Sequence, residues 1–148
     1  MSRLLLLAPI SVDSQDVIAA AARLGHEVRT VSHRGSPPHD LPPEVVEDLV
    51  VDFSDVEAAS RITEHAVTRR IDGILTTREF LTPLVARVCA DLSLRGNDVT
   101  LADGARNKIA MAEQFARFEV SAPRTFVVDR EAAVDDLVCV VSYPFLLW

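Results

Sequence analysis

The sequence predicts an α/β fold in which helices cover both faces of a doubly wound parallel sheet. Short apolar runs that suit strands alternate with longer segments whose apolar residues recur at helical spacing, from the N-terminus to about residue 92. The first run, residues 3–8, is almost continuously apolar, which is typical of a strand buried on both faces. The segments between the runs are long enough for the right-handed crossovers that parallel strands require.

The first strand–helix unit and the second strand occupy the first 32 residues. Residues 3–8 form the first expected strand. Ser14 is expected to cap a helix that reaches Leu24, where Gly25 would stop it. Residues 26–32 alternate between apolar and polar side chains and form the second expected strand. The helix residues expected to face the sheet are Val17, Ala21 and Leu24.

A proline-rich loop leads to the third strand. Residues 33–43 contain four prolines and one glycine, which predicts a surface loop because proline cannot donate a hydrogen bond to a sheet. Residues 49–53 form the third expected strand. Ser54 and Glu57 have the spacing of a capping box, so a helix is expected from there to Arg69. Its expected inner stripe is Val56, Ala59, Ile62 and Ala66.

One more strand and one more helix complete the first expected domain. Residues 72–76 form the fourth expected strand. Residues 80–92 form a helix with Pro83 in its first turn, where proline is tolerated. The domain that follows from this alternation covers residues 1–97.

A second region, residues 98–148, is expected after a shift in composition. A short helix is expected at residues 99–103 and a longer one at residues 105–118, with Gly104 as the break between them. The apolar face of the longer helix is Ile109, Ala112, Phe115 and Ala116.

The last residues of the sequence are predicted in less detail. Residues 123–129 form a strand, residues 131–141 fit either a helix or a strand, and residues 145–148 begin a further strand in which the sequence stops.

Composition and charge exclude several classes of protein. The 148 residues are 49% hydrophobic with a mean hydropathy of +0.19, which excludes intrinsic disorder. The net charge of −7 and the absence of a basic block argue against binding to nucleic acid. Lys108 is the only lysine among 15 basic residues, and an arginine-rich genome explains most of that bias.

Neither a membrane segment, a metal site nor a disulfide is indicated. The apolar run at residues 4–7 is too short to cross a bilayer and no cleavage pattern follows it, so a cytoplasmic location is expected. Cys89 and Cys139 lie 50 residues apart in apolar runs, which predicts two small buried side chains in a reducing compartment. The four histidines do not have metal-ligand spacing.

The turns after the strands hold the candidate polar residues. The first turn, residues 8–12, contains no glycine, so the dinucleotide-binding fingerprint is absent, and the sequence has no P-loop motif. Asp13, Asp52 and Asp72 lie at strand ends or turns, where capping and turn formation explain them.

Arg78 and Glu79 are the candidate substrate-binding residues. They follow the fourth strand at the carboxyl edge of the sheet, where parallel α/β folds bind ligands. The alternative is that Thr77 or Glu79 only caps the following helix.

Arg106 and Lys108 are the candidate cofactor-binding residues. They open the long helix, and two cations beside a helix N-terminus attract anions. The alternative is that Lys108 is an ordinary exposed helix residue.

An ordered series of short motifs resembles the N-terminal part of the ATP-grasp ligases, especially those that join a carboxylate to an amine. The series covers the whole chain, and no member is specific by itself. Its members are Leu24-Gly25-His26-Glu27-Val28, Asp72-Gly73-Ile74-Leu75-Thr76 with Glu79-Phe80, Leu94-Arg95-Gly96-Asn97, Asp103-Gly104-Ala105-Arg106-Asn107-Lys108, Pro123-Arg124-Thr125 and Tyr143-Pro144-Phe145-Leu146-Leu147.

The resemblance implies a Rossmann-like preATP-grasp domain in the first part of the chain, followed by an incomplete α+β ATP-grasp subdomain. In such ligases ATP and Mg²⁺ activate a carboxylate as an acyl phosphate, which an amine then attacks. The lysine that contacts the nucleotide phosphates corresponds to Lys108. The implied partners are a small carboxylate and an amine, and neither a nucleic acid nor a membrane.

The sequence departs from the family pattern at its end. Trp148 stands where the family places a second ATP-binding lysine, and the glycine-rich loop and acidic Mg²⁺ ligands would lie further on. We therefore expect a truncated fragment that is inactive by itself. The alternative is a non-catalytic ATP-grasp-derived module that binds a partner or forms a homodimer through exposed apolar residues such as Phe145 and Leu146.

Overall fold

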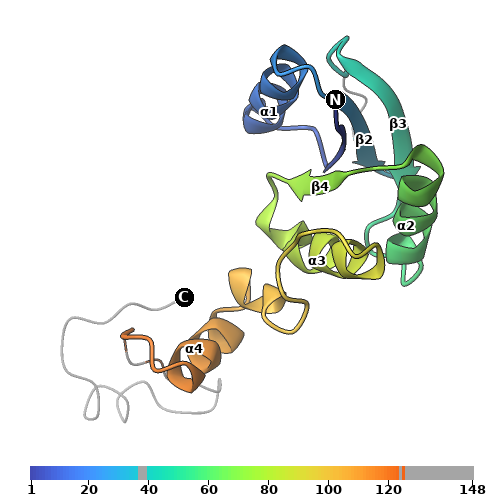
Figure 1. The fold of residues 1–148 in the computed structure, drawn as a ribbon. Helices are drawn as coiled ribbons and strands as arrows, with labels where there is room; N and C mark the ends of the chain where they lie inside the picture. The colour runs from blue at the N-terminus through green and yellow to red at the C-terminus, as the bar shows by residue number, and fades with distance from the viewer. Residues whose placement is uncertain (37–39, 124, 126–148) are drawn as a thin grey trace.

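The computed structural model describes residues 1–36, 40–123 and 125 (Figure 1). The predictions for residues 126–148, including Cys139 and the last two expected strands, lie outside the described residues. The first six elements are β1 (Arg3–Leu7), α1 (Val12–Arg23), β2 (Glu27–His33), β3 (Val45–Val51), α2 (Ala58–Arg69) and β4 (Gly73–Thr76). The remaining four are the 3₁₀ turn η1 (Glu79–Leu81), α3 (Thr82–Asp91), the 3₁₀ turn η2 (Ala102–Ala105) and α4 (Lys108–Arg117).

The four strands form one parallel sheet in the order β3-β2-β1-β4, which confirms the predicted fold class. β1 is central, and its Leu5 lies opposite Arg29 on one side and Ile74 on the other. Helix α1 packs on one face of the sheet, while α2 and α3 pack on the other. β2 and β3 are added on one side of β1, and β4 is added on its other side. The strand order therefore reverses between β1 and β4.

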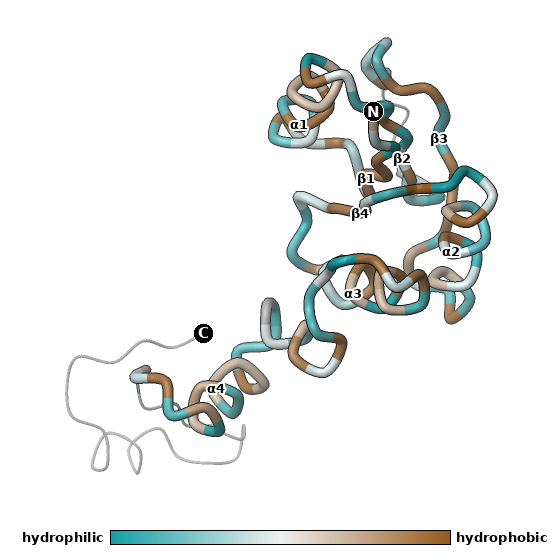
Figure 2. Tube along the Cα trace, in the orientation of Figure 1, coloured by the Kyte–Doolittle hydropathy of each residue, from teal (hydrophilic) through white to brown (hydrophobic). Residues whose placement is uncertain are grey.

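Burial on both faces explains the apolar first strand. Leu5 and Leu7 join the core beneath α2 and α3, whereas Leu6 points to the other face, where it joins Ile18 of α1 and Val28. Leu5, Leu6 and Leu7 are each at most 1% exposed. Figure 2 shows β1 as a strongly hydrophobic stretch. Burial of one such side chain contributes roughly 1.5–3 kcal/mol, so both faces of this strand stabilise the fold.

Helix α1 begins earlier than predicted. Of the three residues expected to face the sheet, Ala21 is buried and Val17 packs against the core, whereas Leu24 is exposed. Its N-cap is Ser11, whose Oγ accepts a hydrogen bond from the backbone N–H of Ser14 at 3.2 Å. Ser14 is therefore inside the helix and fully buried, and the predicted Ser14 cap is wrong. Leu24 is 75% exposed because the inner stripe runs through Ser14, Ile18 and Ala21. Gly25, with a φ of 75°, ends the helix as predicted.

The predicted capping box before α2 does not form. Asp52 accepts hydrogen bonds from both the backbone N–H and the hydroxyl of Ser54, at 2.9 and 2.6 Å, and this turn takes Ser54 away from the helix. Helix α2 starts only at Ala58, so Val56 is 96% exposed and not part of the inner stripe. The helix ends at Arg69 as predicted. The buried residues of α2 are Ala58, Ile62 and Ala66.

The boundaries of the remaining elements of the sheet layer are close to prediction. β3 begins at Val45, four residues before the predicted start at residue 49, because it extends along β2 through a β-bulge. β4 is one residue shorter than predicted, and α3 carries Pro83 in its first turn. The 3₁₀ turn η1 was not predicted as a separate element.

The region after α3 departs from prediction at the break between its two helices. Gly104 lies inside η2, and the break falls at Asn107, whose side-chain oxygen accepts hydrogen bonds from the N–H groups of Ile109 and Ala110. Asn107 is therefore the N-cap of α4, which begins at Lys108. In Figure 1, α4 lies apart from the sheet, with η2 between it and α3.

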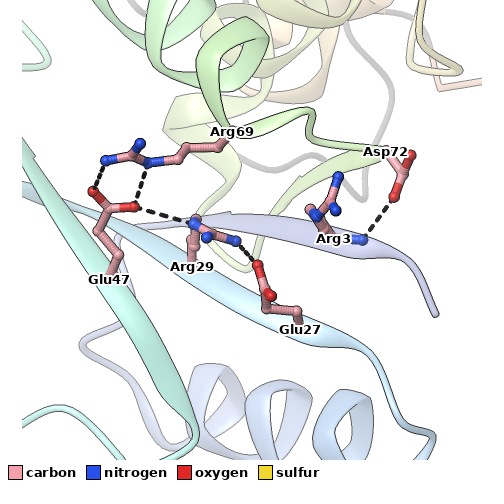
Figure 3. Close-up of polar contacts among 6 residues, drawn as sticks. All are labelled: Arg3, Glu27, Arg29, Glu47, Arg69 and Asp72. Atoms are coloured by element: carbon pink, nitrogen blue, oxygen red, sulfur yellow. Dashed lines mark hydrogen bonds and ion pairs between the residues drawn. The ribbon is translucent and has the colours of Figure 1, made fainter.

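Two carboxylates connect strands of the sheet with neighbouring segments of the fold (Figure 3). Glu47 of β3 accepts two hydrogen bonds from the Arg69 guanidinium of α2, at 2.7 and 2.6 Å, and one from Arg29 of β2 at 3.1 Å. These bonds, above all those from Arg69, lower the pKa of Glu47 from 4.5 to about 2. Asp72 accepts a hydrogen bond at 2.7 Å from the backbone N–H of Arg3, the first residue of β1.

Candidate functional site

The carboxyl edge of the sheet is the first candidate site. In a parallel sheet, the crevice for ligands forms where the order of strands reverses, and here that point lies between β1 and β4. The residues that leave the two strands there are Ala8 after β1 and Thr77 after β4. Ala8 adopts a φ of 55°, a conformation that bends the chain sharply from β1 toward α1.

A cluster of three hydroxyls closes this edge on the α1 side. The Oγ of Ser14 lies 2.7 Å from Oγ1 of Thr77 and 2.9 Å from Oγ of Ser11, and it also donates to the carbonyl oxygen of Ala8 at 3.4 Å. Ser14 is completely buried, whereas Ser11 and Thr77 are partly exposed. Ser14 therefore fixes β4 to α1, and the other two hydroxyls border the edge. Sequence reasoning missed this cluster, because residues 63 positions apart meet only in the folded chain.

Arg78 lies on the opposite side of the same edge. Its backbone N–H donates to Oγ1 of Thr76 at 3.0 Å, and its guanidinium lies over the ring of Phe80, 5.7 Å from the centroid. Its Nε is shielded from solvent and has no hydrogen-bond partner in the described part of the chain. The predicted alternative, a cap supplied by Thr77 or Glu79, is wrong because neither η1 nor α3 has a side-chain cap.

Glu79 is placed differently from its neighbour Arg78. It is the first residue of η1 and is exposed, and none of the ion pairs between described residues includes it. The structure therefore places both predicted substrate-binding residues at the carboxyl edge but does not pair them with each other.

Three aspartates at strand ends and turns have structural roles, as predicted. Asp52 accepts the two hydrogen bonds from Ser54, which lower the pKa of its carboxyl group. Asp72 bonds the backbone of Arg3, and Asp13 lies in the first turn of α1, where a negative charge favours the helix. No group of three or more potential metal ligands occurs among the described residues.

Arg106 and Lys108 lie at the start of α4, away from the carboxyl edge. Both residues are exposed, and Lys108 is the first residue of the helix. The Asn107 side chain already bonds two N–H groups of this helix end. An anion here would therefore be held by the side-chain charges of Arg106 and Lys108 together with the helix dipole.

A shallow depression lies beside Thr82, the first residue of α3. It forms where the start of α3 faces the segment that leads to η2. Its lining residues are Thr82, Asn97, Asp98, Leu101 and Ala102. Asp98 accepts hydrogen bonds from the hydroxyl and N–H of Thr100, which keep the pKa of its carboxyl group below its usual value.

Cys89 is a free thiol that is buried, and burial raises its pKa. Gly96 packs against it so closely that a Cβ at residue 96 would lie 2.7 Å from the Cβ of Cys89.

Among the described residues, no helix combines the length and apolar character needed to cross a bilayer.

These observations define a parallel α/β domain whose ligand edge lacks a glycine-rich turn. The family model of the ATP-grasp N-terminal domain matches residues 18–96, which is more than half of the chain. The chain therefore belongs to the ATP-grasp N-terminal domain family, as its sequence motifs had indicated.

Solved structures with the same fold include ATP-grasp ligases. The L-amino acid ligase from Bacillus licheniformis aligns with a TM-score of 0.69 and 22% identity over 83% of this chain and 30% of its own. Phosphoribosylglycinamide synthetase from Anaerococcus prevotii aligns with a TM-score of 0.69 and 23% identity, over 97% and 35% of the two chains. The ADP-bound biotin carboxylase domain of a thermophilic 2-oxoglutarate carboxylase aligns with a TM-score of 0.53 and 20% identity, over 79% and 28%.

The present chain thus spans about a third of the length of these proteins. The low identities establish a common fold. No match is found among curated protein sequences.

Proposed function

We propose that this chain is the N-terminal part of an ATP-grasp ligase that activates a carboxylate as an acyl phosphate for attack by an amine. The observation that carries the proposal is the family match over residues 18–96, followed after η2 by a helix that begins with Lys108. One of the similar structures is named as an L-amino acid ligase, which favours small carboxylates and amines as substrates. The proposed division is a preATP-grasp domain at residues 1–97 and the start of the ATP-binding domain at residues 98–148.

Lys108 and Arg106 are the proposed contacts to the nucleotide phosphates. Their positions at the start of α4 add two positive charges to the positive end of the helix dipole, a combination that attracts phosphate oxygens. ATP with Mg²⁺ would supply the phosphoryl group and neutralise its charge during transfer. The residues described here do not include a cluster that fits the metal ion, so its ligands are not assigned to them.

Arg78 and Glu79 are the proposed substrate-binding residues. Both follow β4 at the carboxyl edge, next to the point where the strand order reverses.

By themselves, the 148 residues are proposed not to complete the ligase reaction. The basis is that they align with only about a third of the ligases whose fold they share. The test is incubation with ATP, Mg²⁺ and a mixture of amino acids, followed by measurement of ADP and acyl phosphate. Formation of either above the level without protein contradicts the proposal.

The nucleotide assignment is tested by calorimetric titration with Mg·ATP. The variant Lys108→Ala is expected to bind at least ten-fold more weakly than the parent chain. Arg61→Ala is the matched control, because Arg61 is an exposed cation on α2, away from α4. Unchanged binding in Lys108→Ala would show that Lys108 does not contact the nucleotide.

The second candidate function is that of a non-catalytic module that forms a homodimer. For this candidate and for the ligase fragment alike, the proposed location is the cytoplasm. The supporting observation is the apolar face of α4, where none of the described side chains is buried. Ile109, Phe115 and Val120 line an open groove there with Pro123. Sedimentation that shows a dimer without any Mg·ATP binding favours this candidate, and deletion of residues 143–148 tests whether they hold the dimer together.

A further inference from the structure

We infer that Arg78, backed by Phe80, is a receptor for the carboxylate group of a small substrate. The inference rests on the proposed function only for the identity of the substrate, a carboxylic acid. The binding of an oxyanion at Arg78 follows from the surroundings of its side chain.

The first observation is an unsatisfied donor. Nε of Arg78 is shielded from solvent and has no acceptor among the described residues. A buried donor without a partner is destabilising, and more so when it is charged, so native structures keep few of them. A ligand oxygen that displaces the side chains covering Nε would remove this cost.

The second observation is that the charge of Arg78 is not neutralised by a neighbouring carboxylate. Three other arginines of the fold form ion pairs: Arg69 and Arg29 with Glu47, and Arg87 with Asp91. Arg78 has no such pair in the described part of the chain, although Glu79 follows it directly. What sets Arg78 apart is that it is a partly buried cation whose shielded Nε has neither an ionic partner nor a hydrogen-bond acceptor among the described residues.

The third observation is that the guanidinium is held in one orientation. It stacks over Phe80 at 5.7 Å, a distance at which the ring face attracts the cation. The backbone beneath it is also fixed, because Oγ1 of Thr76 accepts from the N–H of Arg78 at 3.0 Å and donates to the carbonyl of Leu7 at 3.2 Å. A planar donor fork held in this way suits bidentate binding of an oxyanion.

The place and the charge favour a carboxylate over a phosphate. Arg78 follows β4 at the point where the strand order reverses, which is the usual ligand position in this class of sheet. One guanidinium balances the single charge of a carboxylate, whereas a phosphate group carries between one and two charges at neutral pH. Glu79, exposed beside the site, adds a negative charge that further disfavours a dianion.

The test is a nuclear magnetic resonance titration of the 148-residue chain with sodium acetate, with sodium phosphate and, for reference, with sodium chloride at equal ionic strength. The side-chain Nε–H signal of Arg78 and the backbone amides of residues 77–80 are followed. Acetate is expected to shift these signals to saturation, with a lower dissociation constant than phosphate. Binding of phosphate that equals or exceeds that of acetate overturns the carboxylate assignment, and shifts no larger than those with chloride overturn the site.

Four variants show which side chains are responsible, each checked for an unchanged amide spectrum elsewhere. Arg78→Lys should raise the dissociation constant for acetate at least ten-fold, since an ammonium lacks the planar fork. Arg87→Lys is the matched control and should leave it unchanged, because Arg87 is already paired with Asp91. Phe80 is a positioning residue: Phe80→Leu should weaken binding several-fold and Phe80→Trp should restore it. Equal binding in Arg78→Lys and the parent chain contradicts the inference.

The test of acetate binding at Arg78 can succeed or fail independently of the test of Mg·ATP binding through Lys108. Lys108→Ala should not change acetate binding, because Lys108 lies on α4 and not at the carboxyl edge. If Mg·ATP binding depends on Lys108 while acetate leaves the Arg78 signals unmoved, the inference at Arg78 fails and the proposed function stands.

Discussion

The ion cluster around Glu47 makes a measurable prediction about stability and pH. Its carboxylate joins β3 to α2 through Arg69 and to β2 through Arg29. The substitution Glu47→Gln removes the charge and leaves both guanidinium groups without their shared partner. We expect the free energy of unfolding to fall at pH 7.

The expected size follows from the pKa of Glu47. It is lowered from 4.5 to about 2, which at about 1.4 kcal/mol per pKa unit sets an upper limit of about 3 kcal/mol. Solvent reaches 31% of the Glu47 side chain and 40% of that of Arg69, which screens the attraction. The expected loss in Glu47→Gln is therefore about 1–2 kcal/mol.

The direction of the pH dependence is fixed by the lowered pKa. The unfolded chain takes up a proton at Glu47 near pH 4.5, whereas the folded chain does so only near pH 2. The contribution of the carboxylate is therefore complete above pH 4.5 and disappears as the pH falls through 2. The parent chain and Glu47→Gln should differ at pH 7 and approach each other near pH 2.

The assay is urea unfolding followed by circular dichroism at pH 7, 4 and 2.5. The control is Asp91→Asn, which removes the more exposed pair with Arg87 within α3 and should cost no more than about 0.5 kcal/mol. A difference between parent chain and Glu47→Gln that is constant from pH 7 to pH 2.5 would refute the electrostatic explanation, since it would then reflect only a change in packing.

Four more substitutions test the packing and capping described above, all by the same unfolding assay. Ile62→Ala should lower the free energy of unfolding by about 2–5 kcal/mol because Ile62 is fully buried, whereas Val56→Ala, at a 96% exposed position before the same helix, should change it by less than about 0.5 kcal/mol. Gly96→Ala should cost about 1–3 kcal/mol because its Cβ would lie 2.7 Å from that of Cys89; a neutral effect would show that the close contact is wrong. Ser11→Ala should cost about 1 kcal/mol through loss of the N-cap, and no loss would mean that Ser11 is not the cap.

The candidate site was only partly predictable from the sequence. Arg78 and Glu79 were found because they follow a strand, and the carboxyl ends of parallel strands are where ligands bind. The structure separates the two: Arg78 stacks on Phe80 with a buried Nε, whereas Glu79 is exposed. No sequence pattern distinguishes these environments, because burial of Nε depends on how the side chains around it pack in the folded chain.

The sequence by itself determined the class of fold. Strands buried on both faces must be apolar at almost every position, as in β1. In helices at the surface, apolar residues must recur every three to four positions. These patterns are local, so the alternation of strands and helices could be read directly. The stop at Gly25 was also predictable, since glycine readily adopts the positive φ found there.

Only the tertiary structure decided which polar residues act at the ends of the elements. Ser11 and Ser14 are both suitable caps by type, and Ser11 takes that role because Ser14 is drawn into the interior by Thr77. Ser54 similarly bonds Asp52 and leaves α2 uncapped. Such choices depend on partners far along the chain or on the competing geometry of a turn, and a local sequence pattern cannot rank them.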